Sequence, residues 1–551
     1  MKKNESDKIV INSSNLDIEN FDRNKFKINL NRIALIFIAI FIVIVLYSTK
    51  IIFLSSKKFE KKNYISNQIN RADITDRNGN FISKSVFTTN VGIDPKLVKN
   101  KKKLLIKLQY TFPEKNILEI QNKLSGKNFF YIEKKVTPDR FKKIKLLGEK
   151  SIRLEPKITR IYPDKNLFSH IIGQIDDDNN GISGIEKSFD RKLKDGRKQL
   201  ITTLDKELQF IIRNELLNAQ NIFKNVGGAG ILMDINNGEI LSLVSVPDFN
   251  LNHREDISDK KFINRATKGV YELGSVFKTF TIAAGFNYNL ISPSDIFNNL
   301  EKKMKCGGRT ISEYDENLPN DLSVEEILIH SSNIGSVKIG QIIGKEKMKE
   351  FLGLIGMLDK MELDIEEVGK PLPFKWRNCK LKTVSYGHGI TTTPIQLARG
   401  YAILSNGGYK VNPTLIKKKF DKTKKQKILN NDTSSKINSI LRKVVTSGTA
   451  SLSDVDGYEV GGKTGTAQVV ENGIYTNKKI NTFASVFPIS DPKYVLVILL
   501  EDTKLSTDYV YKYRNNSGSF KGTPFNTAGW TSVEIAGKII DKIGPILATK
   551  Y

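Results

Sequence analysis

An unbroken apolar stretch near the start of the chain constrains its fold more than any other feature. Residues 33–47 read IALIFIAIFIVIVLY, and the apolar sequence continues through Ser48, Thr49 and Lys50 to Leu54. About 22 helical residues at about 1.5 Å each span about 33 Å, which is enough to cross the hydrocarbon core of a bilayer. The exit lacks the small residues of a signal-peptide cleavage site, so the sequence predicts an uncleaved anchor over 33–54.

The charges around this segment do not decide its orientation. Lys25, Lys27 and Arg32 precede it, and lysines also follow it at 57, 58, 61 and 62, so the positive-inside rule discriminates weakly. No second apolar span follows in the sequence. We therefore expect a tail over residues 1–32 on one side of the membrane and the large remainder of the chain on the other.

Length and charge limit the function classes. The chain has 551 residues, too many for one ordinary core, which predicts about two to four domains. Its net charge of +28 comes from scattered lysines rather than from an arginine and aromatic platform, so no nucleic-acid partner is expected. The basic runs favour a solvated lysine face over contact with anionic glycan strands or lipid head groups.

The cysteines and histidines predict no metal site. Cys306 and Cys379 lie far apart, and the four histidines show no ligand spacing. Two cysteines allow at most one disulfide, and two free buried thiols are the default expectation.

Residues 55–222 are predicted to form a mixed α/β pedestal domain. Residues 72–86 predict two short strands around Asn78-Gly79, a strong hairpin signal, and two lysine-rich helical stretches follow. The Gly-, Asn- and Asp-rich stretch 160–190 predicts loops and short strands. Apolar spacing in 204–223 predicts a helix that closes the domain.

Residues 223–551 are predicted to form a second, α+β domain. It begins with an apolar hairpin, helical patterns dominate from about 262 to 406, and apolar strands return after residue 460. A final amphipathic helix starts near Thr531, and 504–528 reads as a long surface loop that is mobile or gates a site. Strands at both ends with helices between them predict an antiparallel sheet with helices on its faces.

Ser275 and Lys278 lie three residues apart in YELGSVFKTF. The spacing alone is weak, because serine and lysine recur at this spacing at 55 and 58, 258 and 261, and 490 and 493. Gly274 and the apolar run after Ser275 predict that the serine lies in the first turn of a helix, where residues i and i+3 share a face and free backbone N–H groups face a developing oxyanion. A serine nucleophile needs an adjacent base, and lysine serves as one when burial or nearby cations lower its pKa.

Two further short motifs follow along the chain. Ser331-Ser332-Asn333 reads as a helix start, where serine and asparagine are common caps. Lys463-Thr464-Gly465-Thr466 reads as a glycine-rich edge strand, whose glycine lets a substrate backbone lie flat while its lysine and hydroxyls face a carboxylate. Each motif alone has an ordinary structural explanation, but SxxK, SxN and KTG in this order are typical of penicillin-binding proteins and class A β-lactamases.

The chain closely resembles class B penicillin-binding proteins from about residue 70 to 505. Beyond the three motifs, the resemblance rests on DRNG at 76, GISGIEKSFD at 181, MDINNGEILSLVSVPDFNLN at 233, YGHGITTTPIQLA at 386 and VVTSGTA at 444. It implies a penicillin-binding/β-lactamase-like transpeptidase domain over 223–551, a dimerisation-type pedestal over 55–222, and no cofactor. Leu273 departs from the pattern, because most relatives carry proline there; this loosens the turn and removes no chemistry.

The resemblance also implies a role for each motif residue. Ser275 would attack the penultimate D-alanine carbonyl of a peptidoglycan stem pentapeptide, with Lys278 as the base and Ser331 relaying the proton to the leaving amine. An amine from a neighbouring stem would then take the acyl group and form a cross-link. β-Lactam antibiotics mimic D-Ala-D-Ala and would trap Ser275 as a stable ester.

The other motif residues would hold the substrate. Asn333 would bind the peptide amide, and Lys463, Thr464 and Thr466, with Gly465 between the threonines, would hold the terminal carboxylate. The backbone N–H groups of Ser275 and Thr466 would form the oxyanion hole.

The resemblance further implies a place in the cell. Elongation-type relatives usually carry aspartate where this chain has Asn333, which favours the division-specific, septal branch and leaves the elongation type as the alternative. It implies a single-pass protein of the bacterial inner membrane, with an extracytoplasmic catalytic domain and a membrane glycosyltransferase of the division machinery as partner.

Three rival functions remain open from sequence. A β-lactamase or carboxypeptidase uses the same serine with water, although the anchor and large pedestal argue against a dedicated hydrolase. A membrane β-lactam sensor needs extra spans or a signalling domain, for which the tail of about 32 residues is too short. In a structural division scaffold catalysis is secondary, and Ser275→Ala separates that function from the others.

Overall fold

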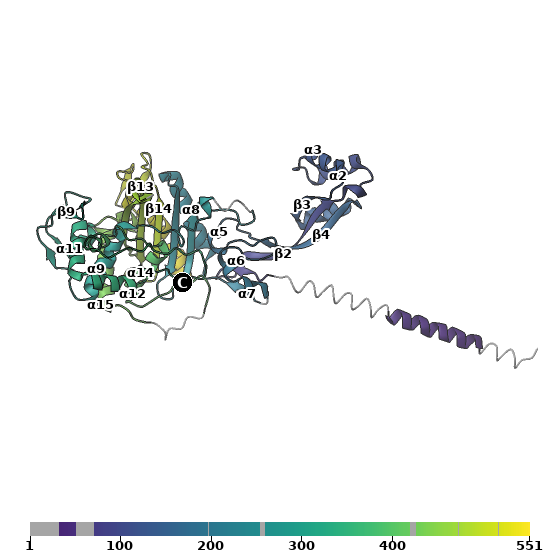
Figure 1. The fold of residues 1–551 in the computed structure, drawn as a ribbon, viewed down its shortest axis with the longest axis horizontal. Helices are drawn as coiled ribbons and strands as arrows, with labels where there is room; N and C mark the ends of the chain where they lie inside the picture. Colours follow the sequence, from purple (N-terminus) through teal and green to yellow (C-terminus); the bar gives the residue numbers. More distant parts are fainter. Residues whose placement is uncertain are drawn as a thin grey trace, which may run out of the picture. The chain divides into compact units, whose positions relative to one another are not determined.

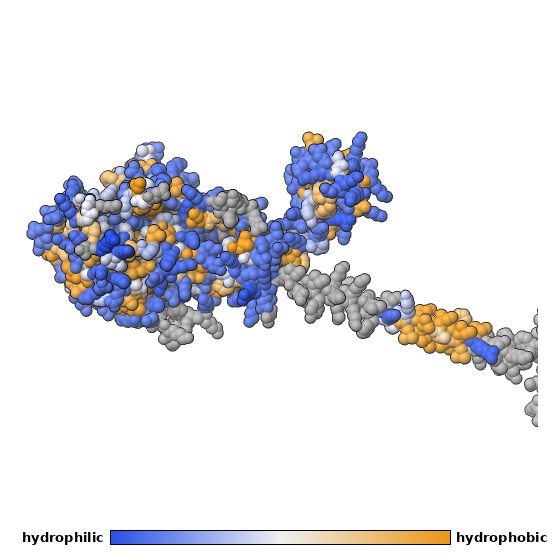
Figure 2. All heavy atoms as spheres, viewed as in Figure 1, coloured by the Kyte–Doolittle hydropathy of each residue, from blue (hydrophilic) through white to orange (hydrophobic). Residues whose placement is uncertain are grey.

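The computed structural model describes residues 32–50, 71–196, 198–253, 259–418, 426–471, 473–515 and 517–551. The chain divides into two units, Met1–Asn70 and Arg71–Tyr551. In the first unit, one helix, Arg32–Lys50, is long and apolar enough to cross a membrane, and its apolar side chains form the continuous orange segment in Figure 2. The rest of the predicted span, 51–54, and the predicted tail up to residue 31 lie outside the described residues.

A five-stranded sheet forms the centre of the second unit (Figure 1). Its neighbouring strands are all antiparallel. Long apolar runs bury β6, β7 and β14 almost completely, so the sheet must be covered by helices on its faces. The strands in spatial order are β12 (Gly461–Glu471), β13 (Ile474–Phe487), β14 (Tyr494–Glu501), β6 (Gly227–Asp234) and β7 (Ile240–Val246).

Helices cover this sheet, as the predicted α+β class requires. α8 (Lys206–Phe223) and the C-terminal α16 (Ser532–Lys550) pack on each other and on the strands, and α14 (Pro394–Ser405) also packs on the strands. α9 (Lys278–Asn287) packs against α11 (Asn333–Ile343) and α15 (Asn431–Thr446). The remaining elements here are η2 (Lys260–Phe262), η3 (Gly274–Phe277), β8 (Ile296–Phe297), β9 (Lys303–Cys306), β10 (Arg309–Ser312), β11 (Leu322–Ser323), α10 (Val324–Ile329), α12 (Lys345–Leu354), α13 (Asn378–Val384) and η5 (Ser451–Ser453).

A second sheet lies in residues 71–201. Its strands are β3 (Phe130–Val136), β2 (Phe81–Ile93), β1 (Ile74–Thr75) and β5 (Leu200–Ile201), with β4 (Ile152–Ile161) also paired to β2. The predicted Asn78-Gly79 turn is present: Gly79 has φ +88°, and Asp76 Oδ1 accepts from the backbone N–H groups of Asn78 and Asn80. The strand after it is longer than predicted, because it pairs with β3 and β4 as well as with β1.

The 160–190 stretch differs from the prediction of loops and short strands. It contains α5 (Ser169–Ile172) and α6 (Gly184–Ser188), and α7 (Asp190–Lys194) follows directly. These helices are too short to show a helical period, so the pattern misses them. The buried Glu186 on α6 accepts from Arg71 Nε at 2.5 Å and from Arg160 Nε at 2.8 Å. The GISGIEKSFD segment therefore contributes the carboxylate at the centre of a buried ion-pair network.

Residues 91–154 contribute a small separate core. Three helices pack apolar side chains against β2, β3 and β4, where two lysine-rich helical stretches were predicted. The helices are α2 (Lys101–Thr111), α3 (Ile117–Ser125) and α4 (Pro138–Leu146), after the short η1 (Pro95–Leu97).

Two sequence expectations are wrong. Cys306 on β9 and Cys379 on α13 form a disulfide, with Cα atoms 5.5 Å apart, rather than two free thiols; the fold brings together cysteines that are 73 residues apart. Residues 504–528 are more ordered than a long loop: they form the hairpin β15 (Val510–Lys512) and β16 (Ser519–Lys521) and lead into η6 (Ala528–Trp530). Burial of Tyr511, whose hydroxyl donates to the Trp530 carbonyl at 2.8 Å, holds the hairpin to the domain.

Candidate active site

Ser275 lies in a tight turn held on both sides by glycines. The turn is η3, and α9 continues directly from it at Lys278, as the motif predicts. Gly274 has φ +65°, and an added Cβ would lie 2.8 Å from the Thr466 carbonyl oxygen. From the other side, a Cβ on Gly387 would lie 2.0 Å from the Gly274 carbonyl oxygen. Backbone packing therefore fixes the serine, which remains partly exposed and lines a cavity.

Lys278 is buried and points to the second motif. Its Nζ donates to the carbonyl oxygen of Ser331 and to Ser331 Oγ, the latter at 3.0 Å. Burial lowers the pKa of Lys278 to about 7, while the nearby carboxylate of Glu313 acts in the opposite direction. An amine with such a pKa is available as a base near neutral pH.

Lys463 approaches the same hydroxyl from β12. Its Nζ donates to Ser331 Oγ at 3.0 Å and to the Thr464 carbonyl at 3.1 Å, and its side chain is fully buried. Burial, followed by the proximity of Lys278, holds the pKa of Lys463 well below its usual range. Ser331 Oγ thus lies between two amines from different elements.

The second motif forms the start of α11. Ser332 caps the helix by accepting from Gly335 N at 2.9 Å, so Ser331 stands just before the cap, with φ +62°. Asn333 lines the cavity, and its Nδ2 donates to the Ser312 carbonyl at 2.8 Å. The carboxylate of Glu313 binds this helix start, although no sequence motif includes it.

The third motif lies on β12, an edge strand of the sheet. Thr464 and Thr466 line the cavity. Thr464 Oγ1 is 2.8 Å from Thr449 Oγ1, and Thr466 Oγ1 donates to Asn481 Oδ1 at 3.1 Å. Thr449 lies in the VVTSGTA segment, so that resemblance could have identified it, whereas nothing in the sequence marks Asn481.

Gly465 has a tighter constraint than the sequence suggests. A Cβ there would lie 2.2 Å from the Leu273 carbonyl oxygen and 3.0 Å from Val276 Cγ1. The glycine therefore allows the serine turn to pack directly against β12, which brings the first and third motifs together.

The cavity that the motifs share has a volume of about 850 Å³. Ser275, Lys278, Ser331, Asn333, Thr464 and Thr466 line it, together with Tyr314, Tyr386, His388 and Trp530. In the described part of the chain no group of three His, Cys, Asp or Glu residues is placed to hold a metal. The arrangement offers a serine nucleophile, an amine base and a second amine beside hydroxyl donors.

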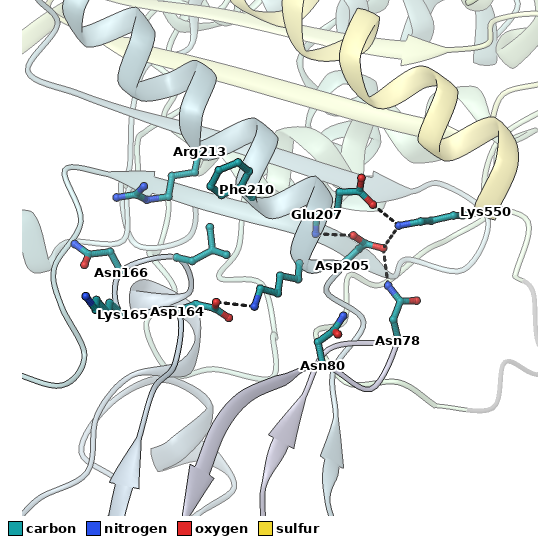
Figure 3. Close-up of a pocket in the computed structure, with 12 residues that line it drawn as sticks. Asn78, Asn80, Asp164, Lys165, Asn166, Asp205, Glu207, Phe210, Arg213 and Lys550 are labelled. Atoms are coloured by element: carbon teal, nitrogen blue, oxygen red, sulfur yellow. Dashed lines mark hydrogen bonds and ion pairs between the residues drawn. The ribbon is translucent and has the colours of Figure 1, made fainter. Parts of the chain in front are cut away.

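A second cavity, of about 610 Å³, lies near the start of α8 and the end of α16 (Figure 3). Two ion pairs join charged side chains of its lining: Lys206 with Asp164 at 2.6 Å, and Lys550 with Glu207 at 2.5 Å. None of the motif residues lines it.

Comparison with known proteins gives consistent matches. The family model for the penicillin-binding protein transpeptidase domain matches residues 228–520, and that for the penicillin-binding protein dimerisation domain matches residues 66–216. "Probable peptidoglycan D,D-transpeptidase FtsI" of Caulobacter vibrioides is 29% identical over 499 residues, covering 87% of this chain and 82% of the relative.

Two other relatives and one solved structure extend the comparison. Peptidoglycan D,D-transpeptidase FtsI of Escherichia coli is 27% identical, covering 80% of each chain. Stage V sporulation protein D of Bacillus subtilis is 28% identical, covering 79% of this chain and 74% of the relative. A peptidoglycan synthetase from Bifidobacterium adolescentis shares the fold, with a TM-score of 0.65 at 19% identity, covering 88% of this chain and 96% of that one.

Proposed function

Because this chain belongs to the penicillin-binding protein transpeptidase family, we propose that it is a serine-type peptidoglycan D,D-transpeptidase that cross-links stem peptides. The observation that carries the proposal is the convergence of Lys278 and Lys463 on Ser331 Oγ beside the partly exposed Ser275. Two buried amines around one hydroxyl are costly to maintain, and a proton-transfer site explains why they are retained.

In the first half-reaction Ser275 Oγ attacks the carbonyl of the penultimate D-alanine. The hydroxyl proton passes to Lys278, whose pKa near 7 leaves much of it neutral at neutral pH. The backbone N–H groups of Ser275 and Thr466 stabilise the oxyanion. As the C–N bond breaks, the proton moves through Ser331 to the amine of the leaving D-alanine, and the acyl-enzyme remains.

In the second half-reaction an amine from a neighbouring stem attacks the ester. It loses its proton along the same path to Ser275 Oγ, so the new amide forms and the enzyme is restored. Water in place of the amine gives hydrolysis, the carboxypeptidase alternative. A ring-opened β-lactam has no departing amine and stays on Ser275.

Substrate binding is assigned to the edge strand and the second motif. An extended peptide alongside β12 can pair with its free edge, while Asn333 contacts the peptide amide. Lys463, Thr464 and Thr466 hold the terminal carboxylate, and Gly465 keeps the strand against Ser275. The carboxylate of an arriving substrate raises the pKa of Lys463 and favours its charged form. Substrate binding therefore protonates the lysine that holds this carboxylate.

The proposed setting is the bacterial inner membrane. The Arg32–Lys50 helix has the length and composition of a single-pass anchor, with the domains over 55–222 and 223–551 outside the cytoplasm. We favour septal synthesis with a division glycosyltransferase as partner, on the basis of Asn333 and the names of the FtsI relatives. Elongation-type and sporulation-type synthesis are the alternatives, and septal labelling in cells separates them.

The decisive experiment is intact-mass analysis after incubation with a fluorescent penicillin, followed by peptide mapping. We expect one stable adduct on the peptide that contains Ser275, and none on Ser275→Ala. Ser490→Ala is the matched control, because Ser490 and Lys493 repeat the spacing outside the cavity. A folded wild-type protein that forms no adduct would exclude the proposed chemistry, and growth of cells carrying only Ser275→Ala would favour the scaffold function.

A further inference from the structure

Glu313 is a buried carboxylate that no motif includes. It directly follows β10, and its side chain reaches the start of α11 from a different part of the chain. Oε1 accepts from Ser332 Oγ at 2.6 Å and from Ile334 N at 2.9 Å, and Oε2 accepts from Asn333 N at 2.7 Å. The first N–H groups of a helix have no partner within the helix, so one carboxylate satisfies two of them together with the cap hydroxyl.

These bonds fix the residue just before the cap. Ser331 has φ +62°, a left-handed conformation that is unfavourable for a residue with a Cβ and persists only where its surroundings enforce it. Ser332 and Asn333, both bound to Glu313, immediately follow it. Ser312, next to Glu313, also accepts from Asn333 Nδ2, so both ends of Asn333 are tied to this short segment.

Glu313 also acts electrostatically on Lys278. Lys278 and Lys463 both donate to Ser331 Oγ, and the carboxylate of Glu313 binds the two residues that follow Ser331. Lys463 is a like charge to Lys278, and Glu313 is the opposite charge that acts on it.

We propose that Glu313 is a positioning residue of the acyl-transfer site, holding the turn that keeps Ser331 between Lys278 and Lys463 and serving as counter-charge to Lys278. The inference rests on the proposed acyl transfer. Glu313 acts through Ser331 and Lys278 and does not itself contact the substrate.

The test measures acylation of the full-length protein in detergent by a fluorescent penicillin, as a function of pH. Glu313→Gln removes the negative charge. It also replaces Oε2, which accepts from Asn333 N, with an NH₂ group that cannot accept this hydrogen bond. We expect the plateau rate per folded molecule to fall by about 10–100-fold, since small misplacements in an acyl-transfer site have effects of this size. The midpoint of the acid limb should move to lower pH, because the influence that raises the pKa of Lys278 is gone.

Two variants complete the design. Glu316→Gln changes an exposed carboxylate three residues away and should match the wild type in both readouts. Glu313→Asp keeps the charge but is shorter, so its midpoint should stay at the wild-type pH while its plateau falls. If Glu313→Gln does not fold, Glu313→Asp alone decides, and a wild-type plateau in that variant overturns the proposal.

Other outcomes have separate meanings. A Glu313→Gln protein that melts at a lower temperature but keeps the wild-type plateau and midpoint would show a purely structural cap and overturn the proposal. An unchanged midpoint with a lower plateau would overturn the counter-charge role. Failure of the wild type to label Ser275 would instead refute the acyl-transfer function on which the inference rests.

Discussion

At the scale of single residues, the site depends on how burial changes lysine chemistry. An ordinary lysine is protonated throughout the physiological range and cannot accept a proton from serine. Lys278 and Lys463 are at most 1% exposed, and loss of water favours their neutral forms. Both amines also lie within hydrogen-bond distance of Ser331 Oγ, so the two lysines with altered pKa values meet at one hydroxyl.

We predict a specific pH dependence from Lys278. Its pKa is about 7, and the neutral amine is the proposed base, so acylation should be half-maximal near pH 7 and approach its plateau about one pH unit higher. Well below pH 7 the rate should fall about tenfold per pH unit as the amine is protonated. Stopped-flow acylation by a fluorescent penicillin measures the profile.

Lys278→Arg tests the assignment, because a guanidinium stays charged. We expect a loss of about 10²–10⁴-fold in acylation rate, the usual contribution of a general base. Lys493→Arg, at the repeated spacing outside the cavity, is the control. A residual rate in Lys278→Arg close to the wild type would assign the base to another group.

At the scale of elements, the sequence predicted the parts of the site better than their connections. Local patterns predict three placements: Ser275 in a helical turn, Ser332 as a helix cap and Lys463 on an edge strand. The structure confirms all three. The contacts of Glu313 and the Cys306–Cys379 pair depend on segments brought together only by the tertiary fold. Short-range periodicity carries no information about such pairs.

We predict that Gly465→Ala separates the first and third motifs. The new methyl would lie 2.2 Å from the backbone oxygen of Leu273, so β12 or the serine turn must shift. We expect acylation to fall by about 100-fold, since positioning errors near 1 Å have effects of this order. Gly353→Ala is the matched control, because its Cβ meets open space. Wild-type acylation by Gly465→Ala would show that the turn is adaptable.

At the scale of the whole molecule, Met1–Asn70, which includes the long apolar helix, and Arg71–Tyr551 are separate units in their contacts. One large core runs through the five-stranded sheet, its helices and part of the pedestal, including Ile74, Tyr162 and Ile185. Residues on both sides of the predicted boundary near 222 therefore share a core, and that boundary marks a change of sequence pattern rather than a gap in packing.

We predict that the second unit works without the first. A chain that starts at residue 66 keeps Arg71, which the buried Glu186 requires. It should remain soluble without detergent and acylate at the full-length rate, whereas the full-length chain should sediment with membranes. Sedimentation and fluorescent-penicillin labelling of both forms provide the measurement. Loss of labelling in the shortened chain would show that the anchor contributes to the catalytic state.

The bond between Cys306 and Cys379 has a consequence for compartment. Lysines on both sides of the apolar segment left its orientation open, but thiols in the cytosol are kept reduced, and structural disulfides form where an oxidant is supplied. The disulfide thus favours the same side of the membrane as peptidoglycan, independently of charge. Maturation of the protein would then depend on the thiol oxidants of that compartment, and mass mapping of these two cysteines in protein from cells reports which side the chain has reached.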